Sequence, residues 1–173
     1  PSMGKTAFAT NIAFNIANQL NNNKISSISK NGKVLFYSLE MSSEQLATRI
    51  VSEVSEIPSE KIRTGNITKS DFSKVVKSSD DISNLNLFID DSPALTVASI
   101  RTRARRLKRK EGLDLIIIDY LQLINSSSTN SNDNRVKEVS DITRGLKAIA
   151  KELNIPVIAL SQLSRKVEDR EEK

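Results

Sequence analysis

The sequence of 173 residues is 38% hydrophobic and 27% charged, which fits a single globular domain over residues 1–173. It contains no cysteine and no histidine, which excludes disulfides, thiol nucleophiles, Ser-His-Asp catalysis and most zinc hydrolases. Chemistry must therefore use carboxylates, amines, hydroxyls and a bound metal, while the net charge of +5 permits an anionic partner, either nucleotide or nucleic acid.

The sequence also carries no apolar run long enough to span a bilayer and no signal-peptide layout. We therefore expect a soluble, unsecreted protein with no membrane partner. The absence of cysteine agrees with a reducing compartment.

The chain opens on Pro1-Ser2-Met3-Gly4-Lys5-Thr6, which runs into an apolar stretch with helical spacing from Ala7 to Leu20. These residues match the end of the P-loop pattern G-x-x-x-x-G-K-[ST], whose opening glycine would precede Pro1 by two positions. In such a loop Gly4 lets the backbone approach the phosphates, Lys5 supplies positive charge, and Thr6 offers a hydroxyl to Mg²⁺. This stretch alone leaves a phosphate cradle and a chance match both open.

Short apolar runs predict strands at 34–39, 85–89, 113–118 and 156–160, and helical patterns lie between them. This alternation predicts an α/β fold with a mostly parallel sheet flanked by helices on both faces. The carboxyl ends of parallel strands share one edge, where ligands bind.

Polar side chains stand at three of these strand ends. Glu40 follows the first run, Asp119 ends the third, and Gln162 follows the fourth. A β-branched strand that ends in a carboxylate is the Walker B arrangement, in which the acid holds the Mg²⁺ of a nucleotide. Next to the P-loop, the three residues would supply a metal ligand, a carboxylate that orients water and an amide that senses a phosphate. A core strand that merely ends at Asp119 is the alternative.

Capping patterns predict helix starts at Ser42, which has Gln45 three residues later, at Thr68 with Phe72, Val75 and Val76 as its apolar stripe, and at Thr96. The helix after Thr96 is rich in cations, for which a solvated face and an anion-binding surface are both open. These cations are Arg101, Arg103, Arg105, Arg106, Lys108, Arg109 and Lys110. Loops are expected at 21–32 and 125–134 because both segments are rich in Asn and Ser.

Together these segments resemble the C-terminal motor domain of the DnaB family of bacterial replicative DNA helicases, which has the RecA-like P-loop NTPase fold. The resemblance is carried by residues 1–7, by Ser38-Leu39-Glu40-Met41-Ser42, by residues 118–124 and by Ser161-Gln162-Leu163-Ser164-Arg165. It extends to 63–65 and 100–107, so it covers nearly the whole chain.

The resemblance implies an ATP hydrolase that uses ATP and Mg²⁺. Residues Ser2, Met3, Gly4, Lys5, Thr6 and Ala7 would bind the nucleotide, with Thr6 and Asp119 at the metal. Glu40 would polarise the attacking water, and Gln162 would couple the γ-phosphate to DNA contacts. The 125–134 loop would face the channel of a homo-hexameric ring that grips single-stranded DNA, with Arg135 beside it as a weaker DNA-binding candidate.

Family features missing from the chain lead us to expect a fragment with little or no unwinding activity. The strand before the P-loop is missing, and so is the C-terminal part with its arginine finger. A primase and a helicase loader are the partners that the family implies, in a bacterial cytoplasm at the replication fork. A RecA-type recombinase or repair ATPase, and a non-catalytic P-loop scaffold, are the alternatives.

Overall fold

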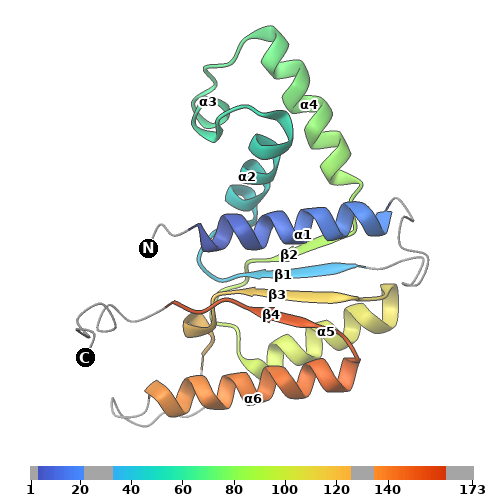
Figure 1. Cartoon of the computed structure of the whole chain (residues 1–173), viewed down its shortest axis with the longest axis vertical. Coiled ribbons are helices and arrows are strands. Elements are labelled where there is room, and N and C mark those ends of the chain that lie inside the picture. Colours follow the sequence, from blue (N-terminus) through green and yellow to red (C-terminus); the bar gives the residue numbers. More distant parts are fainter. Residues whose placement is uncertain (1–3, 22–32, 126–134, 163–173) are drawn as a thin grey trace, which may run out of the picture.

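The computed structural model of the chain describes residues 4–21, 33–125 and 135–162 (Figure 1). The predicted loops at 21–32 and 125–134 lie outside this part except for Asn21, which ends α1, and Asn125. The residues after 162 lie outside it as well. Helices and strands alternate along the chain as predicted. In order they are α1 (Lys5–Asn21), β1 (Val34–Ser38), α2 (Ser43–Ser55), α3 (Ser59–Thr64), α4 (Lys69–Ser83), β2 (Leu87–Asp90), α5 (Val97–Glu111), β3 (Leu115–Asp119), η1 (Leu121–Leu123), α6 (Arg135–Leu153) and β4 (Val157–Ala159).

The four strands form one parallel sheet in the order β2-β1-β3-β4. Every residue of β1 and β3 is buried, because both strands are central and covered on both faces. Strands β2 and β4 lie at the edges and are only partly buried. The predicted parallel α/β sheet is therefore confirmed.

Helices cover both faces of the sheet. Helix α1 packs on one face through small residues, Ala9, Ala13 and Ala17, which let it approach the alternate side chains of β1 and β3 closely. Helices α5 and α6 cover the other face, where Ile100 and Ile149 are fully buried against the strands. Figure 1 shows α1 above the sheet and α5 and α6 below it.

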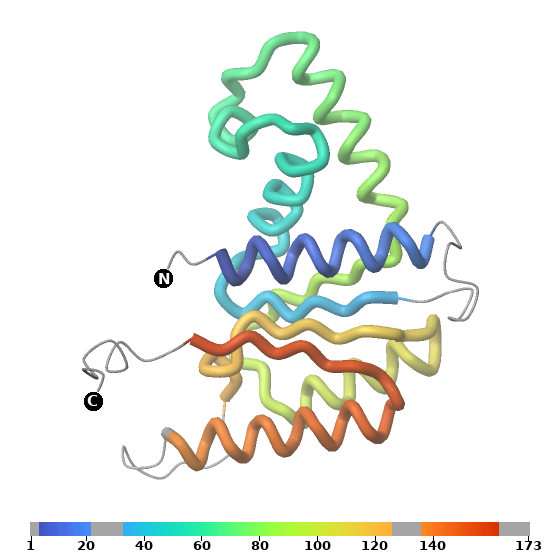
Figure 2. Tube along the Cα trace, in the orientation of Figure 1, coloured from blue at the N-terminus to red at the C-terminus, as the bar shows by residue number. Residues whose placement is uncertain are grey.

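Helices α2, α3 and α4 rise from the sheet as a separate group, with α4 packed along α2 (Figure 2). Ser42 forms the predicted capping box with Gln45, and Thr68, which the sequence pattern predicts only as a cap, forms a capping box with Asp71. The predicted apolar stripe of α4 is only partly used, since Phe72 is 58% exposed and Val76 43% exposed. Helix α4 leaves the body of the molecule, so the sheet does not cover this stripe.

Phe8 differs from what the sequence pattern predicts. As an apolar residue of the first helix it is expected to widen the buried surface, but it is 68% exposed, although Ile12 and Ile16 on the same helix pack against the core. Within the described ranges, no helix combines the length and the apolar character that crossing a membrane requires.

Candidate active site

Helix α1, which begins directly after Gly4, starts at the same edge of the sheet as the carboxyl ends of the strands (Figure 2). Gly4 has φ = +73°, a left-handed conformation that strains any residue with a Cβ, although a Cβ there would meet no neighbouring atom. The amides of the first helical turn have no acceptor within the helix and carry the positive end of its dipole. The start of α1 is therefore suited to an anion.

Lys5 reaches from this turn to the tips of two strands. Its Nζ donates a hydrogen bond to the carbonyl oxygen of Ser161, just beyond β4, at 3.3 Å. The same ammonium lies 5.3 Å from the ring centroid of Tyr120, which follows β3. The predicted phosphate-binding lysine is thus at the edge of the sheet where the other candidates are expected.

Asp119 is the last residue of β3 and is 1% exposed. Its carboxylate oxygen Oδ1 has no hydrogen-bond partner among the described residues. A buried carboxylate without a partner is unfavourable unless a cation or water satisfies it. No cluster of three or more acids able to hold a metal occurs in the described part of the chain. The single buried carboxylate of Asp119 suits Mg²⁺ bound to a nucleotide, because that ion takes one or two protein groups beside phosphate oxygens and water.

Glu40 lies two residues beyond β1 on a short segment that is held on both sides. The backbone N–H of Leu39 donates to the carbonyl of Asp119 at 2.8 Å, and the Ser38 hydroxyl donates to the carbonyl of Met41 at 2.7 Å. The Glu40 side chain itself is exposed. The backbone is thus fixed next to Asp119 while the carboxylate faces solvent.

Asp91 binds the end of the same segment, where α2 begins. Its Oδ2 accepts a hydrogen bond from the backbone N–H of Ser43, the first residue of α2, at 2.7 Å. This backbone hydrogen bond lowers the pKa of the Asp91 carboxyl below its ordinary value. A negative charge at this place also complements the dipole of α2.

Gln162 is exposed, three residues beyond β4, and its backbone is tied to a second glutamine. Gln162 N–H donates to Gln122 Oε1 at 3.2 Å, while Gln122 Nε2 donates to Gln162 O at 3.0 Å and to Ser161 Oγ at 2.8 Å. The sequence pattern predicts a role for Gln162 but none for Gln122, Tyr120 or Ser161. One sequence signal could have pointed to these three residues, because all of them belong to the segments that carry the family resemblance.

The structure therefore brings Lys5, Asp119, the Glu40 backbone and Gln162 to one edge of the sheet. The other predicted site residues are less defined. Thr6 and Ala7 continue α1, and the backbone carbonyl of Thr6 accepts a hydrogen bond from Thr10. Ser2 and Met3 lie outside the described residues. Arg135 begins α6, and its side chain is also outside the described part.

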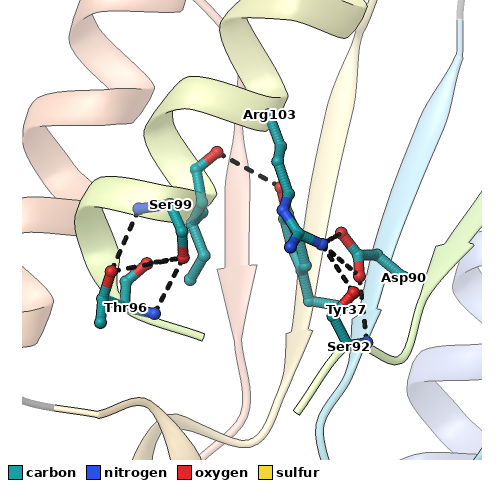
Figure 3. Close-up of polar contacts among 7 residues, drawn as sticks. Tyr37, Asp90, Ser92, Thr96, Ser99 and Arg103 are labelled. Carbon is teal, nitrogen blue, oxygen red and sulfur yellow. Dashed lines mark hydrogen bonds and ion pairs between the residues drawn. The ribbon is translucent and has the colours of Figure 1, made fainter. Parts of the chain in front are cut away.

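A polar network beside the site joins α5 to strands β1 and β2 (Figure 3). Arg103 Nη1 donates to both carboxylate oxygens of Asp90, at 2.9 and 2.6 Å, and to Ser92 Oγ at 2.7 Å. Tyr37 OH donates to the carbonyl of Ile100 at 3.3 Å. Burial raises the pKa of Tyr37 well above its ordinary value. For Asp90 burial acts in the raising direction, but hydrogen bonds from Ser92 and Arg103 outweigh it and lower its pKa.

Several cations of α5 have partners within the fold. Arg103 pairs with Asp90, and both Arg101 and Arg105 pair with Glu152 of α6. These contacts tie α5 to its neighbours. In this part of the basic face they favour cations that pair within the fold over an anion-binding surface. A hollow further along α5 is lined by Thr102, Arg105, Arg106, Arg109 and Lys110, and there the anion-binding surface stays a prediction.

Comparison with known proteins adds to this geometry. The family model described as DnaB-like helicase C terminal domain matches residues 1–173. The chain is 56% identical over 173 residues to the replicative DNA helicase DnaB of Rickettsia typhi and 48% identical to that of Geobacillus stearothermophilus. Both alignments cover 100% of this chain but only 34% and 36% of those proteins, so the chain spans about a third of their length.

Two solved structures share the fold at 36% sequence identity. One is a DnaB-like replicative helicase described with its interactions with primase, with a TM-score of 0.85 over 99% of this chain and 39% of that one. The other is described as an ATPase domain, with a TM-score of 0.84 over 98% of this chain and 57% of that one.

Proposed function

The chain belongs to the DnaB-like helicase C-terminal domain family, and from that premise we propose that residues 1–173 form part of one RecA-like domain that binds and hydrolyses ATP with Mg²⁺. In the complete protein this hydrolysis drives movement along single-stranded DNA and unwinding of the duplex at the replication fork. The observation that carries the proposal is the meeting of Lys5 with the strand tips beside the buried Asp119.

The phosphates would lie at the start of α1. There the first-turn amides and Lys5 would face the anion. Lys5 now donates to the carbonyl of Ser161, which is a neutral group, and a charged phosphate oxygen would replace it as the stronger acceptor. Thr6, at the next position of α1, would offer its hydroxyl to the metal. Residues Ser2, Met3, Gly4 and Ala7 complete the proposed loop around the nucleotide.

Asp119 would hold the metal ion. Its Oδ1, which has no partner among the described residues, is a hard, anionic oxygen at the sheet edge, which is the ligand type that Mg²⁺ prefers. When bound, the ion neutralises charge that develops on the phosphate oxygens. A buried carboxylate and a hydroxyl from the start of α1 are oxygen ligands of the kind that magnesium takes, and Lys5 would hold the phosphates of the nucleotide that carries the ion.

Glu40 would orient the attacking water and accept its proton. An exposed carboxylate on a fixed backbone next to Asp119 can do so without a histidine. Gln162 would sense the γ-phosphate through its amide. Phosphoryl transfer depends mainly on positioning and charge stabilisation, which this set of groups can supply.

In the complete protein, we expect a homo-hexameric ring with single-stranded DNA in its channel and Arg135 near the strand. A primase and a helicase loader are its proposed partners, and the bacterial cytoplasm its location. A RecA-type recombinase would share the nucleotide site and differ in exchanging strands without unwinding them.

The test is ATP turnover by the complete protein with Mg²⁺, measured with and without single-stranded DNA. We expect turnover that single-stranded DNA strongly stimulates, together with unwinding of a forked duplex. Stimulated turnover with strand exchange and no unwinding would favour the recombinase. Absence of ATP binding would favour a non-catalytic scaffold.

A further inference from the structure

The side-chain amide of Gln122 uses both its oxygen and its nitrogen on the segment that follows β4. The oxygen accepts from the backbone N–H of Gln162, and the nitrogen donates to the carbonyl of the same residue and to the hydroxyl of Ser161. The amide and the backbone of Gln162 therefore form a closed pair. The pair needs both the oxygen and the nitrogen of the Gln122 amide. A glutamate carboxylate has no N–H donor, and a serine or threonine hydroxyl cannot span the two backbone groups.

Gln122 is held on a rigid base. It lies in η1, whose Leu121 is 6% exposed and donates its backbone N–H to the carbonyl of Leu160 at 2.9 Å. Ile124, after η1, is 3% exposed. The side chain of Gln122 thus extends from the core just after Asp119 to a segment that is itself exposed.

Lys5 contacts the same segment through the carbonyl of Ser161. The segment of Ser161 and Gln162 is therefore bonded both to the proposed phosphate-binding lysine and to Gln122. Once a phosphate takes the Lys5 ammonium, the described side-chain bonds that still hold the segment are those of Gln122.

We propose that Gln122 is a positioning residue that fixes Ser161 and Gln162 relative to Asp119, so that the Gln162 amide meets the γ-phosphate in the orientation that hydrolysis requires. The inference rests on the proposed function of the site. It predicts that losing Gln122 lowers the rate of hydrolysis and its response to DNA while ATP binding through Lys5 and the start of α1 stays intact.

The experiment uses the complete protein and compares wild type with Gln122→Ala, the near-isosteric Gln122→Glu, Gln162→Ala and the double variant Gln122→Ala/Gln162→Ala. Gln19→Ala, an exposed glutamine on α1, is the matched control. For each protein we would measure the Kd for a fluorescent non-hydrolysable ATP analogue, kcat with and without single-stranded DNA, and Tm.

We expect both Gln122 variants to lower DNA-stimulated kcat by at least about tenfold, with the Kd within about twofold of wild type and Tm nearly unchanged. Gln122→Glu should behave like Gln122→Ala because it loses both donors. The double variant should be no slower than Gln162→Ala, because Gln122 acts through Gln162. Gln19→Ala should resemble wild type.

Normal turnover in both Gln122 variants would overturn the inference. So would losses that multiply in the double variant, or a loss of affinity and of Tm together with kcat, since these would indicate a general structural support. A wild-type protein that binds or hydrolyses no ATP would instead overturn the proposed function itself, so the two failures are distinguishable.

Discussion

Lys5, at the start of α1, donates a hydrogen bond to the backbone carbonyl of Ser161, 156 positions later in the sequence. This contact closes the site, because it joins the first helix to the tip of the last described strand. It also keeps the lysine at the edge of the sheet, where, among the described residues, its ammonium donates to a neutral carbonyl. A nucleotide phosphate would be a stronger partner, so the contact shows where the anion would compete.

Changing Glu40 to Gln in the complete protein should lower ATP turnover by about 10²- to 10⁴-fold, because an amide cannot accept the proton of the attacking water. ATP binding should stay within a few-fold of wild type, since no phosphate contact is assigned to Glu40. Steady-state hydrolysis and analogue binding check this. Glu44→Gln, on the first turn of α2, is the control. Normal turnover in the Glu40 variant would remove its proposed role.

Changing Asp119 to Asn should lower Mg²⁺-dependent turnover by at least about 100-fold, because the metal loses its anionic ligand. Without Mg²⁺ and nucleotide, Tm should not fall, since the change removes a buried charge whose Oδ1 has no described partner. Thermal unfolding in EDTA and a magnesium titration of the rate measure the two effects. A variant with wild-type magnesium dependence would show that the metal binds elsewhere.

Changing Ser42 to Ala should destabilise α2 by about 1 kcal/mol, because the Ser42 hydroxyl accepts from Gln45 N–H in a capping box. The Glu40 segment precedes this cap directly, so kcat should fall as well. Urea unfolding followed by circular dichroism and ATP turnover measure both. Ser70→Ala, at an exposed position in the first turn of α4, is the control. Equal effects of the two changes would argue against the cap.

The ion pair of Asp90 and Arg103 should make stability depend on pH. The folded-state pKa of Asp90 is lowered, so the pair stabilises the fold above the ordinary aspartate pKa of about 4. This contribution is lost as the pH falls through the lowered pKa that Asp90 has in the folded state. Asp90→Asn should therefore lower Tm at pH 7, and the difference from wild type should shrink below about pH 4.

The control for that series is Asp80→Asn, at an exposed position on α4. Its Tm should follow that of wild type at both ends of the pH range. If the Asp90→Asn difference were the same at neutral and acidic pH, the pair would contribute no charge-dependent stability.

Much of the fold could be predicted because local patterns and tertiary structure agree. Strands β1 and β3 are continuous apolar runs, as strands buried on both faces must be, and the caps at Ser42, Thr68 and Thr96 mark the helix starts. The family resemblance is confirmed by the match of the family model. Strand order could not be predicted, because contacts between distant segments decide which parallel strands become neighbours.

Candidates for the site could be chosen from the sequence where a side chain ends a strand, and less so elsewhere. Asp119 stands out as a candidate because it ends an apolar run, whereas Gln122 lies in a three-residue helix with no periodicity to mark it. The ion-pair partners of the α5 cations could not be predicted either, because Glu152 and Asp90 belong to other elements, which only the tertiary fold brings next to α5. The roles assigned to all the site residues, Ser2, Met3 and Arg135 included, stay predictions.

The most direct test is an experimental structure of the complete protein with Mg²⁺ and a non-hydrolysable ATP analogue. We predict that Lys5 Nζ leaves the Ser161 carbonyl for a phosphate oxygen, that Asp119 lies beside the metal, and that the Gln162 amide faces the γ-phosphate. A nucleotide bound away from this edge of the sheet, with Lys5 still on Ser161, would contradict the assignment.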